Sequence, residues 1–270
     1  MTTAAVADRR DSGVTFPRVV RAEWLKFRTV RSSWLTLAVT MVLVVGLGAL
    51  FTAARASHWP PRDAVDALTF DPTRISLAGV FLAQLAVGVL GVLVVSAEYT
   101  SGTIRATFTA VPRRLPVLLA KPLVFAVLTV VALVPTTFAA FAVGQDLLSS
   151  KHINTTLSAP NVTRAVVGAA LYLAVVGLFG VALGWLLRHT AAAISALFGV
   201  LLIVPLLARL LPSPWSDDVS KWLPSNAGQA VFAVRPEASS LGPWSGLGLF
   251  GLYVVAGLVI GAVVVSRRDA

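Results

Sequence analysis

Residues 122–144 read PLVFAVLTVVALVPTTFAAFAVG and contain no Asp, Glu, Lys, Arg or His. A bilayer core about 30 Å thick needs about 20 apolar residues in a helix, whose backbone satisfies its own hydrogen bonds. Five further stretches have the same character: 35–53, 75–96, 165–187, 191–208 and 244–265. A charge at a helix centre would cost about 2.5–3.5 kcal/mol. The pattern therefore predicts an all-α polytopic membrane protein with six transmembrane helices.

The composition agrees with this class. Hydrophobic residues make up 57% of the 270-residue chain and charged residues 13%, against about 25% charged in soluble domains. The absence of cysteine excludes disulfides, thiol nucleophiles and cysteine metal sites. The first apolar stretch follows a long basic segment and is long enough to span. We therefore expect a retained first helix and no cleaved signal peptide.

Lysine and arginine are distributed unevenly between the two ends of the spans. Fourteen lie in the N-terminal segment, the loop after the second span, the turn after the fourth and the tail, and eight lie in the opposite loops. Because positive residues in short flanking segments stay inside, we expect a plasma-membrane protein with both termini cytoplasmic. The net charge of +10 then reflects topology and attraction to anionic lipid of the bilayer. No nucleic-acid partner is expected.

Segment 17–34, PRVVRAEWLKFRTVRSSW, has the pattern of a basic amphipathic helix on the membrane surface. Its apolar side consists of Val19, Val20, Trp24, Phe27, Val30 and Trp34. Glu23 and Arg31 interrupt this apolar arc. A solvated basic tail is the alternative interpretation.

The loop after the second span, 97–121, reads AEYTSGTIRATFTAVPRRLPVLLAK. Ile104, Phe108 and Val111 have i, i+4, i+7 spacing, which predicts an apolar stripe on a helix of about two turns. Pro112 would end this helix. A short amphipathic helix outside the membrane favours docking against a partner protein.

The six stretches lack the residues that membrane-embedded catalysis or proton-coupled transport needs. They contain no Asp, Glu, His or Cys, so they offer no metal ligands, catalytic base or proton-carrying carboxylate. The sequence has no G-x-x-x-x-G-K-[ST] phosphate loop. A G-x-G-x-x-G match at 246–251 lies inside a span without a preceding strand. We therefore expect no enzyme activity, metal or cofactor in this chain.

Few polar side chains lie within the spans. Gln84 is the only amide, and Thr136 and Thr137 follow a proline that we expect to kink the third span. These three side chains either bond between helices or line a passage, and bonding between helices is the favoured interpretation. Two G-x-x-x-G motifs, at 180–184 and 257–261, predict close helix contacts.

The loop 97–121 resembles a motif of ABC-2 type transporter permeases, the membrane subunits of bacterial ABC exporters. The pattern is E-x-x-x-G-[ST]-…-P-x-[SR]-R-…-K, matched by Glu98, Gly102, Thr103, Ile104, Arg105, Phe108, Val111, Pro112, Arg113, Arg114 and Lys121. The likeness extends over about 17–270. It includes an amphipathic "elbow" helix before the first span, which would hold Trp24 and Phe27, and a large last external loop with short helices.

This resemblance implies a half-transporter that pairs with a second permease copy or a paralogue and with a separate P-loop ATPase. The helix after the second span would be the coupling helix, with Ile104 and Phe108 docked on the ATPase. Glu98 and Arg105 would make polar contacts, and residues 112–114 would return the chain to the membrane. ATP and Mg would bind only the partner ATPase, and the lipid bilayer would surround the spans.

The expected organisation is a cytoplasmic tail and elbow helix at 1–33, a transmembrane domain at 34–266 and a cytoplasmic tail at 267–270. Two other functional classes stay open on the sequence alone. One is a non-transporting membrane scaffold or assembly protein. The other is a membrane-embedded enzyme or ion-coupled carrier, which the missing ionisable residues oppose.

Overall fold

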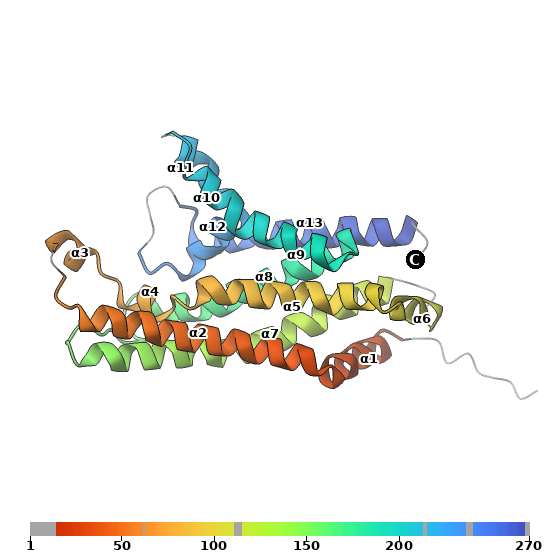
Figure 1. Ribbon diagram of the computed structural model, residues 1–270, viewed down its shortest axis with the longest axis horizontal. Coiled ribbons are helices and arrows are strands. Elements are labelled where there is room, and N and C mark those ends of the chain that lie inside the picture. Colours follow the sequence, from red (N-terminus) through yellow and green to blue (C-terminus); the bar gives the residue numbers. More distant parts are fainter. Residues whose placement is uncertain (1–14, 62, 111–114, 213–214, 236–239, 268–270) are drawn as a thin grey trace, which may run out of the picture.

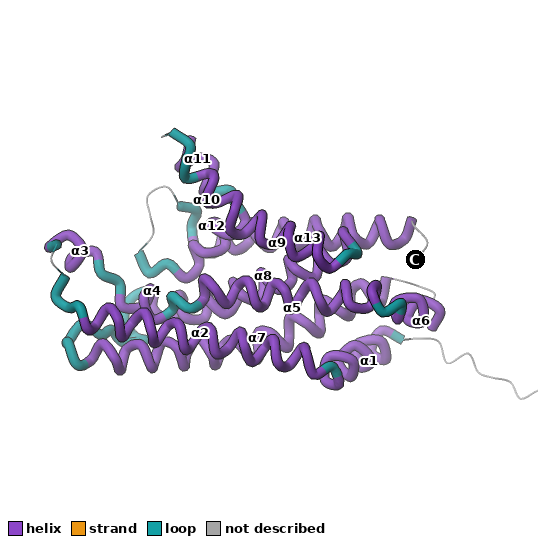
Figure 2. Tube along the Cα trace, viewed as in Figure 1, coloured by secondary structure: helices purple, strands orange, loops and turns teal. Residues whose placement is uncertain are grey.

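The computed structural model describes residues 15–61, 63–110, 115–212, 215–235 and 240–267, and every regular element in these ranges is a helix (Figures 1 and 2). Six helical segments are long and apolar enough to cross a membrane. They are α2 (Arg31–Ser57), α5 (Val80–Thr100), α7 (Leu115–Ser149), α8 (Val162–Leu187), the segment Thr190–Ala208 and α13 (Pro243–Arg267). The prediction of an all-α protein with six spans is therefore confirmed.

The shorter helices gather toward the two ends of the bundle (Figure 1). One end, called here the α1–α6 end, holds α1 (Phe16–Thr29), α6 (Thr103–Ala110) and the C-terminal end of α13. Toward the opposite end lie α3 (Ala64–Thr69), α4 (Pro72–Ser76), α11 (Trp215–Ser220), α12 (Pro224–Gln229) and the 3₁₀ turn η2 (Ala230–Phe232). The large last loop thus contains short helices, as the sequence indicated.

Two spans differ in detail from the apolar stretches that predicted them. The stretch 75–96 includes the end of the separate helix α4, which begins where the Asp71 carboxylate accepts hydrogen bonds from the backbone N–H of Thr73 and Arg74 at 2.9 and 3.1 Å. The fifth span joins α9 (Thr190–Phe198), a π-helical turn η1 (Gly199–Ile203) and α10 (Val204–Ala208). α7 is one helix that continues through both of its prolines.

α8 is the central helix, since it packs against α5, α7 and α13. Small residues let α5 and α8 approach closely: a Cβ atom at Gly91 would overlap the backbone carbonyl oxygen of Gly177. Both G-x-x-x-G motifs lie in such contacts, 180–184 against α5 and 257–261 against α8. Because the nearest atoms in these contacts are backbone or Cβ atoms, neither helix can yield by rotating a side chain.

Gly91→Ala should destabilise the bundle by about 1–3 kcal/mol, the usual cost of overpacking. Gly46→Ala in α2 is the matched control, because a Cβ atom there meets nothing within 4 Å and alanine favours a helix over glycine. Thermal unfolding of both variants in detergent micelles measures the difference. Equal melting temperatures would contradict the close packing of α5 on α8.

Candidate functional site

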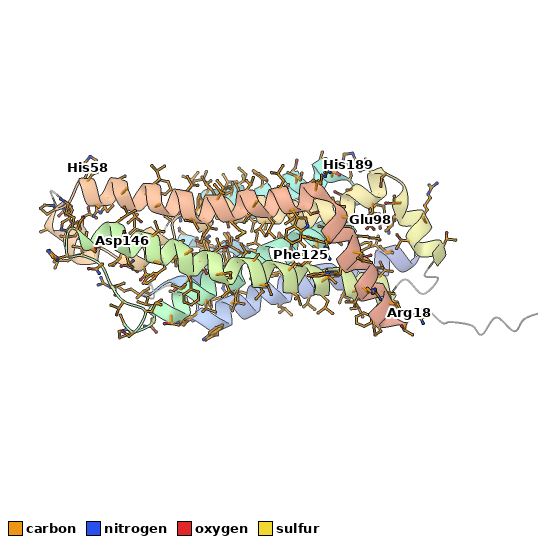
Figure 3. The ribbon with its side chains drawn as sticks, turned by 90° about the horizontal axis from the view of Figure 1, so that it is seen from below. Arg18, His58, Glu98, Phe125, Asp146 and His189 are labelled. Carbon is orange, nitrogen blue, oxygen red and sulfur yellow. The ribbon has the colours of Figure 1, made fainter. Side chains whose placement is uncertain are left out.

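The α1–α6 end contains a buried cluster of charges that begins on α1. This helix starts with Pro17 in its first turn and buries Val19, Glu23 and Phe27, which are spaced i, i+4, i+8 along one face. Only Val30, in an extended conformation, separates α1 from α2. α1 therefore bends away from the axis of α2, with Glu98 of α5 beside it (Figure 3).

Two carboxylates and two ammonium groups meet at this bend. Lys121 Nζ on α7 donates to Glu23 Oε2 at 2.6 Å and to Glu98 Oε1 at 2.8 Å. Lys26 Nζ on α1 donates to Glu23 Oε1 at 2.9 Å and to Glu98 Oε1 at 3.1 Å. These four residues are called the charge quartet below. Each lysine bridges both carboxylates, so the quartet joins α1, α5 and α7.

Burial makes these interactions stronger than surface ion pairs. The side chains of Glu23 and Lys121 are 4% and 3% exposed, Glu98 is 14% exposed and Lys26 is 39% exposed. The formal charges of the four groups cancel. A buried charge is tolerated only with a partner, and removal of one partner typically destabilises a protein by about 3–5 kcal/mol. The quartet therefore fixes the position of α1 on the bundle.

The pKa values of Glu23 and Lys26 on α1 are shifted in the directions that favour the charged forms of these groups. Burial by itself would raise the pKa of Glu23, but the neighbouring ammonium groups of Lys121 and Lys26 outweigh it and hold this pKa below its ordinary value. Burial would likewise lower the pKa of Lys26, but the carboxylates of Glu23 and Glu98 outweigh it and raise this pKa. Both groups are therefore charged at neutral pH.

α6 contacts the quartet through Thr107. α5 ends at Thr100, and Gly102 has a positive φ of 73°, which lets the chain turn before α6 starts at Thr103. The Lys26 ammonium donates to Thr107 Oγ1 of α6 at 3.3 Å. A displacement of α6 would therefore act on the same ammonium group that holds α1 to α5.

One of the predicted coupling residues, Ile104, is placed differently from the sequence hypothesis. Ile104 is 3% exposed and packs into the core of this chain. Its predicted position on an outward docking face is therefore wrong in this conformation, because the Ile104 side chain turns toward its own bundle. Arg105 is exposed. The side chain of Phe108 and residues 112–114 lie outside the described part of the chain.

The predicted elbow residues also divide between two faces. Phe27 is buried and contacts the Trp34 ring edge-on at a centroid distance of 5.8 Å, whereas Trp24 is 42% exposed. In the sequence analysis Glu23 interrupts the apolar arc, but in the structure Glu23 lies at the centre of the buried face of α1. Glu23 and Lys26 were missed as site residues. A carboxylate within an otherwise apolar arc was the signal that could have indicated a buried cationic partner.

The polar residues within the spans have two different roles. Gln84 Oε1 accepts a hydrogen bond from the hydroxyl of Tyr172 on α8, so it links two helices as expected. The hydroxyls of Thr136 and Thr137 instead donate to carbonyl oxygens of their own helix, Ala132 at 2.7 Å and Val134 at 3.0 Å. The expectation of bonds between helices is therefore wrong for both threonines. Within the described ranges, no three His, Asp or Glu residues are grouped to hold a metal ion.

The family model described as "ABC-2 family transporter protein" matches residues 19–209, a region that includes α1, α6 and the whole quartet. The chain belongs to the ABC-2 transporter family. This ABC-2 family member is thus a multi-pass membrane protein and a permease component of an ABC transporter, a transport component that is not itself catalytic. No curated protein matches the chain in sequence.

Lys121→Met should lower stability by about 3–5 kcal/mol, because it leaves two buried carboxylates with one ammonium group. Lys221→Met is the matched control, since Lys221 pairs with Asp218 at 2.7 Å on the surface, where the side chains are 30% and 71% exposed. Such a pair contributes about 0–1 kcal/mol. Thermal unfolding in micelles compares the two variants. A Lys121→Met protein as stable as Lys221→Met would show that the quartet contributes nothing.

The contribution of Glu23 should depend on pH in one direction. Because its pKa is lowered in the folded protein, its stabilisation is present above its ordinary pKa and is lost as the pH falls through the lowered value. The melting-temperature difference between the wild type and Glu23→Gln should be constant near neutrality and shrink below about pH 4.3. A difference that widens on acidification would contradict the assigned shift.

Proposed function

We propose that this chain is the permease subunit of an ATP-driven exporter and that α6 couples it to a separate P-loop ATPase. The family membership supports the permease role. The excess of lysine and arginine in the segments around α1 and α6 supports a cytoplasmic position for that end. Because the sequence lacks a phosphate loop, ATP and Mg would bind the partner.

The observation that carries the proposal is the attachment of α6 to the charge quartet. Lys26 contacts Thr107 of α6 and also holds Glu23 and Glu98. Glu98 lies in the last turn of α5, and Lys121 lies near the start of α7. When the ATPase pair closes on ATP, a shift of α6 would move the ends of α1, α5 and α7 together. Packed helices transmit such a movement along their length, because their interfaces do not deform continuously.

A second permease copy or a paralogue would complete the transport pathway. In α2, the fifth span and α13, less than a third of the most apolar 18-residue stretch is buried within the chain. In α5, α7 and α8 more than half of this stretch is buried. The first group therefore has apolar faces for lipid and for a second subunit. In this arrangement α5, α7 and α8 form the rigid part of each half-transporter.

The topology can be tested with single cysteines, since the chain has none. Ser101 at the α1–α6 end and Ser158 in the loop between α7 and α8 are both exposed. A membrane-impermeant maleimide should label Ser158→Cys in intact cells and Ser101→Cys only after permeabilisation. The reverse pattern would place the α1–α6 end outside and exclude coupling to a cytoplasmic ATPase through α6.

The coupling role of α6 can be tested by reversing one exposed charge. Arg105→Glu should weaken association with the P-loop ATPase that co-purifies with the wild-type chain. Central arginines in interfaces cost about 2 kcal/mol or more when removed, which corresponds to roughly 30-fold in affinity. Co-purification and ATP-dependent transport should fall together while expression stays near normal.

Arg28→Glu is the matched control, because Arg28 is an exposed arginine on α1 and the net charge changes equally. If both variants retain the ATPase, α6 only connects two spans. If the wild type itself captures no ATPase, the scaffold interpretation replaces the exporter.

A further inference from the structure

A cavity of about 160 Å³ lies between α1, α2, α5 and α7 beside the charge quartet. The quartet and Ser33 supply polar lining, and Leu90 and Leu93 of α5 with Phe125 of α7 supply apolar lining. Leu90 precedes Glu98 by eight residues, or about 12 Å along the helix. The cavity therefore changes from charged to apolar as it enters the spans.

The cavity is open to the outside of the bundle at one place. Val30, Ser32 and Ala97 line it and are also exposed. These residues lie at the start of α2 and the end of α5. The cavity can therefore be reached from outside between these two helix ends.

The donors and acceptors of the cavity that have no hydrogen-bond partner among the described residues determine which kind of molecule can bind there. An ammonium group has three donors, and those of Lys26 are used by Glu23, Glu98 and Thr107. Glu98 Oε1 accepts from both lysines, whereas Glu98 Oε2 is buried and accepts from no described residue. Nor does the Ser33 hydroxyl bond to any residue that the structure describes.

The cavity thus offers a carboxylate oxygen and a hydroxyl to an incoming donor. An anion would have to lie beside two carboxylates, with one free donor on Lys121 to receive it. Glu98 Oε2 is covered in this structure, and a partial rotation about the last bond of the Glu98 side chain turns it toward the cavity, where it can accept a further hydrogen bond. A hydroxyl or a primary ammonium group satisfies these requirements.

We propose that this cavity binds the polar end of a single-chain amphiphile that carries hydroxyl or ammonium donors and comes from the adjacent leaflet. The donors bond to Glu98 and Ser33, and the first methylenes lie against Leu90, Leu93 and Phe125. A volume of 160 Å³ holds about five water-sized groups. The rest of the chain therefore leaves through the opening beside Ala97. This site belongs to the single chain and does not rest on its coupling to an ATPase.

Photoaffinity labelling of the purified full-length chain tests the proposal with four dodecyl probes that carry a diazirine on the chain. Their head groups are a primary amine, an alcohol, a trimethylammonium and a carboxylate. The amine and the alcohol should label α5 near residues 90–97, and excess unlabelled amphiphile should abolish this labelling. The trimethylammonium probe has the charge but no N–H donor, so it should label at least about 10-fold less, as should the carboxylate.

Leu93→Trp fills the cavity while leaving the quartet unchanged, and it should reduce labelling by the amine about 10-fold or more. Leu35→Trp is the control, because Leu35 lies on α2, is 67% exposed and does not line the cavity. Equal labelling by all four probes, or by both cations alone, would overturn the proposal. So would undiminished labelling of Leu93→Trp. The comparison of head groups uses the wild-type chain, so it stays decisive if Leu93→Trp does not fold.

Discussion

A buried charge must have a partner, and at the α1–α6 end this requirement determines how α1, α5 and α7 meet. Glu23 and Lys121 are each less than 5% exposed, and the bond between them joins residues 98 positions apart. Neither side chain could be accommodated alone in an apolar bundle. The position of α1 therefore depends on α7, and Glu98 at the end of α5 depends on both lysines. Apolar side chains pack around the quartet, but the ion pairs fix the positions of α1, α5 and α7 relative to one another.

The pairing of buried charges also provides a way for a small movement of α6 to reach the spans. Lys26 is the most exposed member of the quartet and the one in contact with α6. A movement of α6 changes the surroundings of an ammonium group that two buried carboxylates require. Because both carboxylates also bond to Lys121, the helices that carry them should move with α6 as one unit. Close backbone contact between α5 and α8 would then extend the movement into the centre of the bundle.

The sequence predicted the features that depend on local composition. The length of each apolar stretch gave six spans, and the pattern of residues 97–121 gave the short helix α6 and the family. It predicted less well which neighbour each side chain meets. Hydrophobic periodicity classed Glu23 as an interruption, because a partner on α7 is invisible in a local pattern. The helix α6 was predicted from this pattern, but periodicity does not say whether Ile104 faces a partner or its own bundle. Thr136 and Thr137 bond to their own backbone, which spacing alone could not distinguish from bonds between helices.

Hydrogen–deuterium exchange of a Lys26→Met variant tests most directly whether the quartet joins α1 and α6 into one unit. Each carboxylate keeps its bond to Lys121 in this variant, so the bundle should remain folded. The account predicts faster exchange in α1 and in residues 103–110 of α6 together, although the substitution lies on α1 alone. Unchanged exchange in α6 would contradict it and would show that the two helices are held independently.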